Sequence, residues 1–179
     1  MTDEHDASGG PQQMRFADGP TTSAEVLIDA SPDRVWEIVS DITVPVRFSS
    51  ELIDTVWLDG ATGPHEGARF VGRSYHEAVG EWETTSVVTA CDEGRLLEWA
   101  VGDPAEPGAT WRFTVTPAPA GTRLTQWMRI GPGGSGLNAA LDAMPEKESK
   151  ILATRLREHR ANMQRTLEGI KELAERPEH

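Results

Sequence analysis

The sequence has one cysteine, no long apolar run and few basic residues. Because a disulfide needs two thiols, Cys91 alone excludes an intrachain bridge and is typical of a reducing compartment. No apolar stretch reaches the roughly 18 residues that indicate a membrane-spanning helix. Lysine and arginine number 17 against 29 aspartates and glutamates, which gives a formal charge of −12. An acidic surface argues against binding to nucleic acid or anionic membranes. Because the first 20 residues also lack the hydrophobic centre of a signal peptide, we expect a cytoplasmic protein.

Metal and cofactor motifs are also missing. Neither His-Glu pair, at positions 65–66 and 76–77, is followed by the second histidine of a zinc-binding H-E-x-x-H helix. Residues 131–136 spell G-x-G-x-x-G, but only helical sequence follows, whereas a dinucleotide site needs a parallel βαβ unit. We interpret this segment as a loop before the last helices and expect no metal and no cofactor.

A long amphipathic helix is predicted near the C-terminus. Between Pro145 and Glu175 there is no interior proline and only one glycine, Gly169. A stripe recurs at steps of three and four residues and comprises Leu152, Leu156, His159, Met163, Leu167, Ile170 and Ala174. At 1.5 Å per residue such a helix is about 45 Å long. It needs a broad apolar surface to lie on.

The chain before this helix predicts that surface. A first strand is expected over 23–30, followed by a short helix that starts at Pro32 with Ser31 as its N-cap and by a second short helix or turn over 43–50. Turns then separate six candidate strands: 52–58, 67–76, 81–90, 95–101, 110–116 and 122–130. Short connections indicate an antiparallel meander. We therefore predict one α+β domain over 22–176, after a disordered leader over 1–21.

Alternation along the strands separates an inner from an outer face. Arginines mark the outer face of three strands, because burying an unpaired charge is costly. The opposite, inner face then carries Phe70, Ser74, His76, Trp99, Trp111, Phe113, Gln126 and Met128. In 81–90, Trp82, Thr84 and Ser86 share one face, but the period alone does not orient it.

The polar members of this face favour a cavity. A solid core would be aliphatic, since each buried polar group needs a partner. Apolar walls with a few placed polar groups are typical of a small-molecule pocket. The alternative, in which every polar group finds a neighbour and the space is filled, stays open.

Three residues of the final helix are further candidates. His159 lies in the apolar stripe, either as a satisfied core histidine or as a group that orients a ligand or transfers a proton. Met163 lies one turn later and would form a soft wall. Asn162 is three residues from His159, over the same turn.

Several segments carry a resemblance to a known superfamily. They are Ala30-Ser31-Pro32 with Val35-Trp36, Gly67–Phe70, Trp82-Glu83, Gly121–Thr125 and Arg160–Met163. With these, residues 22–175 resemble the START/Bet v 1-like (SRPBCC) superfamily, specifically its polyketide cyclase/dehydrase-like branch. The resemblance implies a helix-grip fold, in which a seven-stranded curved antiparallel sheet surrounds a long C-terminal helix over a ligand cavity, with two short helices after strand 1.

The sequence also departs from the aromatase/cyclases of this fold. The resemblance implies an interior arginine where this chain has Val88, and an interior tyrosine where it has Phe48-Ser49-Ser50-Glu51. Ser74, Ser86 and Asn162 do match polar positions of that branch. Loss of the arginine removes the obvious group for polarising a ligand carbonyl.

We therefore predict a protein, monomeric or homodimeric, that binds a hydrophobic small molecule of polyketide-like or lipid-like character. One alternative is a cyclase or dehydratase that uses His76 or His159 as general acid and base. Another is an interaction module of the chaperone-activator kind, working through an outer face where Trp127 lies between Arg123 and Arg129.

Overall fold

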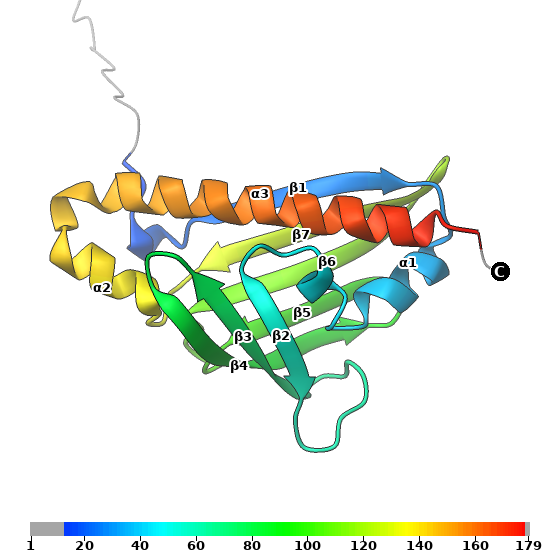
Figure 1. The fold of residues 1–179 in the computed structure, drawn as a ribbon, viewed down its shortest axis with the longest axis horizontal. Helices are drawn as coiled ribbons and strands as arrows, with labels where there is room; N and C mark the ends of the chain where they lie inside the picture. Colours follow the sequence, from blue (N-terminus) through cyan, green and yellow to red (C-terminus); the bar gives the residue numbers. More distant parts are fainter. Residues whose placement is uncertain (1–12, 178–179) are drawn as a thin grey trace, which may run out of the picture.

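A seven-stranded antiparallel sheet curls around one long helix in the computed structural model, which describes residues 13–177 (Figure 1). The strand order is β1-β7-β6-β5-β4-β3-β2, so β2 to β7 form a meander and β1 joins its far end. The strands are β1 (Thr21–Ile28), β2 (Leu52–Trp57), β3 (Arg69–His76), β4 (Gly80–Asp92), β5 (Leu96–Val101), β6 (Ala109–Ala118) and β7 (Gly121–Ile130). The α+β helix-grip architecture that the sequence predicts is confirmed.

Short helices fill the connection between β1 and β2. Helix α1 (Pro32–Val39) starts where the sequence predicts it, and the hydroxyl of Ser31 accepts a hydrogen bond of 3.2 Å from the backbone N–H of Arg34. A single 3-10 turn, η2 (Pro45–Arg47), lies within the segment 43–50, where a second short helix or turn is predicted. The chain then runs through residues 48–51 into β2 beside the long helix.

The long helix, α3 (Glu148–Ala174), lies along the concave face of the sheet (Figure 1). Its buried side contains the apolar members of the predicted stripe and adds Thr166 and Gly169. Gly169 is a point of close approach, because a Cβ there would collide with the ring of Phe48. The predicted stripe thus identifies the buried side of α3 but omits Thr166 and Gly169. It takes no account of the segment 48–51, which lies against the helix.

The helical end of the chain differs in detail from the prediction. The expected start at Pro145 is a 3-10 turn, η3 (Pro145–Lys147), and α3 begins only after it. An additional helix, α2 (Gly136–Ala143), precedes this turn. Ser135 and Asn138 form a reciprocal capping box at its start, in which Ser135 N–H donates to Asn138 Oδ1 at 2.7 Å. The glycine-rich segment thus forms a loop and the first residue of a capped helix.

Part of the predicted leader contacts the domain. The backbone N–H of Phe16, in η1 (Phe16–Asp18), donates to Glu148 Oε1 at 2.8 Å, and that of Met14 donates to Ser149 Oγ at 3.3 Å. Both side chains pack against the core. The remainder of the leader, residues 1–12, lies outside the described residues. Within residues 13–177 no helix is long and apolar enough to cross a membrane.

Candidate functional site

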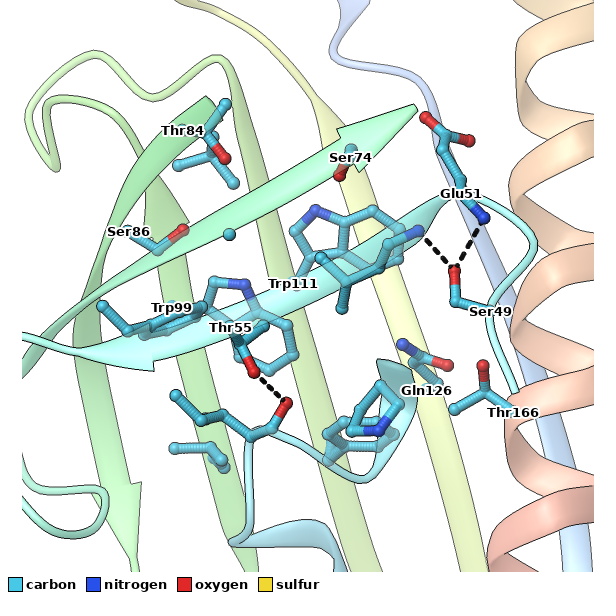
Figure 2. A pocket seen from close by; sticks show the side chains of 18 of the residues that line it. Ser49, Glu51, Thr55, Ser74, Thr84, Ser86, Trp99, Trp111, Gln126 and Thr166 are labelled. Atoms are coloured by element: carbon cyan, nitrogen blue, oxygen red, sulfur yellow. Dashed lines mark hydrogen bonds between the residues drawn. The ribbon is translucent and has the colours of Figure 1, made fainter. Parts of the chain in front are cut away.

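A cavity of about 170 Å³ lies between the concave face of the sheet, the segment 48–52 and α3. Figure 2 shows it from close by, with side chains from several strands and from α3 around it. Its apolar lining includes Val39, Ile42, Leu52, Trp57, Phe70, Val88, Leu97, Trp99, Val101, Trp111, Phe113 and Met163. The polar lining consists of Ser49, Glu51, Thr55, Ser74, Thr84, Ser86, Gln126, His159, Asn162 and Thr166.

Aromatic rings form one wall of the cavity. Trp99 of β5 and Trp111 of β6 are direct cross-strand partners, and their rings are almost parallel, with centroids 6.4 Å apart and an interplanar angle of 7°. Phe70 contacts Trp99 edge-on with centroids 6.1 Å apart, and Phe113 lies 5.9 Å from the same ring. These side chains occupy inward positions of β3, β5 and β6, so the pleat directs all of them to the concave face.

The cavity brings together most of the residues that the sequence proposes as a site. Its lining includes Phe70, Ser74, Thr84, Ser86, Trp99, Trp111, Phe113, Gln126, His159, Asn162 and Met163. The burial of Ser86 and Val88 also orients β4, which the period alone left open: this face of the strand points inward.

Three proposed residues lie outside the lining. Met128 is on the inner face but only 1% exposed, packed into the solid core. Trp82 pairs with Ser74 near the β3–β4 turn, at the end of the sheet. His76 ends β3; its Nε2 is 3.6 Å from Glu158 Oε2, and its Nδ1 accepts the N–H of Ala78 at 3.1 Å. The alternation along a strand indicates on which face of the sheet a residue lies. It does not indicate where along that face α3 leaves a cavity.

The side-chain amide of Asn162 is hydrogen-bonded to residues just before β2. Its Oδ1 accepts the backbone N–H of Ser50 at 2.9 Å, and its Nδ2 donates to Ser49 Oγ at 3.0 Å. Ser49 Oγ in turn accepts the backbone N–H groups of Glu51 and Leu52 (Figure 2). Asn162 therefore fastens the segment before β2 onto α3, which limits what its amide can offer to a ligand.

A partly buried ion pair, absent from the sequence prediction, lies at the same edge of the cavity. Arg155 of α3 donates to both carboxylate oxygens of Glu51, at 2.5 and 3.1 Å, and also to Glu158 at 3.2 Å. The Arg155 and Glu51 side chains are 19% and 15% exposed. No local pattern could reveal this pair, because its members are 104 positions apart. The guanidinium is bound by two carboxylates and does not belong to the cavity lining, so it does not replace the missing arginine at Val88.

His159 differs from Asn162 and Arg155 in the contacts that its side chain makes. Its ring meets Trp111 edge-on, with centroids 5.3 Å apart. Within the described part of the chain its nitrogens have no hydrogen-bond partner. Burial, together with the positive charge of Arg155 and a smaller effect of His76, lowers the pKa of His159 from 6.5 to about 3. The imidazole is therefore neutral at physiological pH, with one nitrogen able to donate and the other to accept.

Other polar groups of the lining divide into satisfied and unsatisfied ones. The Thr55 hydroxyl donates to the carbonyl of Ile42 at 2.9 Å, and that of Thr166 to the carbonyl of Asn162 at 3.1 Å. Gln126 Oε1 is buried and has no partner among residues 13–177. The side-chain hydroxyls of Ser74, Thr84 and Ser86 make no hydrogen bond to any described residue either. These groups, together with the imidazole of His159, are available to a bound molecule.

A second depression, of about 420 Å³, is shallow and polar and lies on another part of the surface, beside Trp36, His65 and Cys91. Burial, reinforced by nearby acidic residues, first among them Glu93, raises the pKa of the Cys91 thiol, which disfavours a reactive thiolate. Across the described residues, no group of three or more histidine, cysteine, aspartate or glutamate side chains is placed to hold a metal ion.

Comparison with known proteins gives a consistent picture. A family model described as polyketide cyclase / dehydrase and lipid transport matches residues 20–175. A polyketide-cyclase-like protein from Corynebacterium glutamicum is 28% identical, with a TM-score of 0.59 over 86% of this chain and 90% of that one. No match was found among functionally curated proteins.

Two further solved structures share the fold at lower identity. The di-domain aromatase/cyclase StfQ from the steffimycin biosynthetic pathway is 16% identical, with a TM-score of 0.64; the match covers 87% of this chain and 50% of that one. A protein from Mesorhizobium loti is 18% identical, with a TM-score of 0.58 over 89% of this chain and 100% of that one.

Proposed function

The chain belongs to the polyketide cyclase / dehydrase and lipid transport family, and we propose that it binds a polyketide-like or lipid-like molecule in the cavity beneath α3. Family membership by itself suggests a hydrophobic ligand. The observation that carries the proposal is the aromatic-walled cavity of about 170 Å³, which holds polar groups that no described residue satisfies.

The energetic cost of the cavity supports a ligand. Unfilled space in a core destabilises a protein by roughly 24 cal/mol per Å³. For a closed, dry cavity of about 170 Å³ this coefficient gives an upper limit on the order of 4 kcal/mol; the cavity in this protein is partly open and carries polar groups, so its cost lies below that limit. An apolar molecule that fills this space recovers much of that energy through burial and dispersion contacts.

The side chains around the cavity favour binding without turnover. A histidine acts as a general acid through its imidazolium form, and at a pKa of about 3 His159 is a neutral imidazole at neutral pH, whose remaining N–H is too weakly acidic for this role. His76 is not part of the lining, and Arg155 is engaged by Glu51 and Glu158. The cyclase or dehydratase alternative thus lacks a free cationic acid at the ligand, because the one formally charged residue of the lining, Glu51, is paired with Arg155.

The chaperone-activator alternative is not favoured either. It would need an exposed Trp127 or a filled interior. The guanidinium of Arg112 instead covers the Trp127 ring, 4.8 Å from its centroid, and the interior contains a cavity.

The test compares two tryptophans under the same substitution. Naphthalene, a neutral apolar probe, should bind saturably to the purified protein in equilibrium dialysis. Trp111→Phe should weaken this binding several-fold, because Trp111 is part of the cavity wall. Trp127→Phe, on the outer face, should leave the binding unchanged. Non-saturable uptake, or equal effects of the two substitutions, would remove the cavity as the binding site.

A further inference from the structure

We propose that the cavity selects a neutral ligand with a hydroxyl group, of the hydroxylated aromatic class, and that this hydroxyl donates to Oε1 of Gln126. The inference rests on the proposed function, because it assumes that the cavity is a binding site. It adds the chemical class of ligand that the site accepts and the residue that recognises this ligand.

Gln126 is an unusual residue for its position. It lies on the inner face of β7, is 7% exposed and lines the cavity, and Figure 2 shows its side chain among those around the hollow. Its direct partners on the two flanking strands are Ala24 of β1 and Phe113 of β6, neither of which has a polar side chain. On the helix above, Thr166 already donates its hydroxyl to the carbonyl of Asn162.

This environment leaves the Gln126 oxygen without a donor. A buried acceptor without a partner costs free energy, and native proteins seldom tolerate one that serves no purpose. A ligand hydroxyl that reaches the oxygen removes this cost, whereas a ligand that can only accept hydrogen bonds does not. The oxygen therefore favours ligands that carry a donor.

The charges around the cavity exclude an anionic ligand. No lysine or arginine belongs to the lining, and Glu51, its one formally charged member, is already bound by Arg155. His159 is neutral at physiological pH. A carboxylate would enter this space without a counterion and close to another carboxylate, which is costly in a low-dielectric interior. Fatty-acid anions are thus poor candidates.

The shape and size of the cavity favour aromatic rings. Trp99 and Trp111 present nearly parallel rings, 7° apart, next to which a flat molecule can stack. An apolar cavity of about 150 Å³ is known to hold benzene. The space of about 170 Å³ in this protein accordingly suits one or two fused rings.

The experiment uses four probes that share a naphthalene core. They are naphthalene, 2-naphthol as donor, 2-acetylnaphthalene as pure acceptor and 2-naphthoate as anion, and equilibrium dialysis at pH 7 gives a Kd for each. We expect 2-naphthol to bind more tightly than naphthalene by between about two- and tenfold, the range that a neutral hydrogen bond gives. We expect 2-naphthoate to bind more weakly than naphthalene.

A matched pair of variants tests the role of Gln126. Gln126→Met keeps the length of the side chain and removes the amide, so 2-naphthol should lose its advantage, and the ratio of the naphthalene Kd to the 2-naphthol Kd should fall to about one. The melting temperature of the ligand-free variant should not fall, because an unsatisfied buried amide is replaced by an apolar group. Gln164→Met is the control, since the amide of Gln164 binds Glu168 on the outer side of α3.

Each other outcome has a definite meaning. Unchanged 2-naphthol binding in Gln126→Met would show that Gln126 does not recognise the hydroxyl. An equal loss for 2-acetylnaphthalene would show that the amide presents its N–H instead, which overturns the donor requirement. Preference of the native protein for 2-naphthoate would overturn the neutral class. If none of the four probes binds, the proposed function itself fails.

Discussion

At the scale of single residues, the neutral state of His159 makes stability depend on pH. The folded protein holds its pKa at about 3, chiefly through burial, while the unfolded chain has the ordinary value of 6.5. Between these values the unfolded state binds a proton that the folded state does not. The free energy of unfolding therefore decreases as the pH falls through this window, by at most about 1.4 kcal/mol per pH unit.

We predict that His159→Gln flattens this dependence. Glutamine retains a polar side chain of similar reach but does not titrate. Denaturant unfolding of the two proteins, measured from pH 7 down to about pH 4.5, should show the native protein losing stability faster than the variant. Parallel pH profiles would mean that the folded protein accommodates a charged His159.

At the scale of elements, the fit between α3 and the segment before β2 shapes the edge of the cavity. Asn162 and Arg165 hold Ser50 by hydrogen bonds of 2.9 and 2.6 Å, and Arg155 holds Glu51. The ring of Phe48 occupies the space that a side chain at position 169 would need. The one glycine of α3 is thus explained by packing and not by a break in the helix.

We predict that Gly169→Ala destabilises the protein. In a free helix this change stabilises by about 1 kcal/mol, because glycine is a poor helix former. In this protein the new methyl group must displace the Phe48 ring, and such overpacking costs about 1–3 kcal/mol. Thermal unfolding should show a lower melting temperature for Gly169→Ala. The double variant with Phe48→Leu should recover part of the loss, and a stabilised single variant would contradict the contact.

At the scale of the whole molecule, the sequence predicted the regular elements and the inner face, but not their mutual fit. Alternation placed Trp99, Trp111 and Gln126 on one face because that pattern is local. Which residues become the partners of a buried polar group is not a local property, because Glu51 and Asn162 each bind a residue more than a hundred positions away. Helix α2 was missed because it starts at Gly136, inside the glycine-rich segment 131–136, whereas α1, of the same length, is marked by Ser31 and Pro32 at its start.

At the same scale, we expect α3 to be indispensable for folding. Five large side chains of its stripe are buried against the sheet and the rest of the core: Leu152, Leu156, Met163, Leu167 and Ile170. Burying each contributes about 1.5–3 kcal/mol, so together they contribute an upper estimate of about 7–15 kcal/mol. This matches the whole net stability of a typical domain, about 5–15 kcal/mol. Without α3, nothing offsets the exposure of the concave face.

We predict that a chain ending at Met144 does not fold. It retains every strand but exposes Leu124, Met128 and the aromatic wall to water, so it should be insoluble or lack cooperative unfolding. A chain ending at Glu175 keeps all of α3 and should unfold like the full-length protein in the same thermal scan. A soluble, cooperatively unfolding fragment 1–144 would show that the sheet closes its own core, and the helix-grip account of stability would then be wrong.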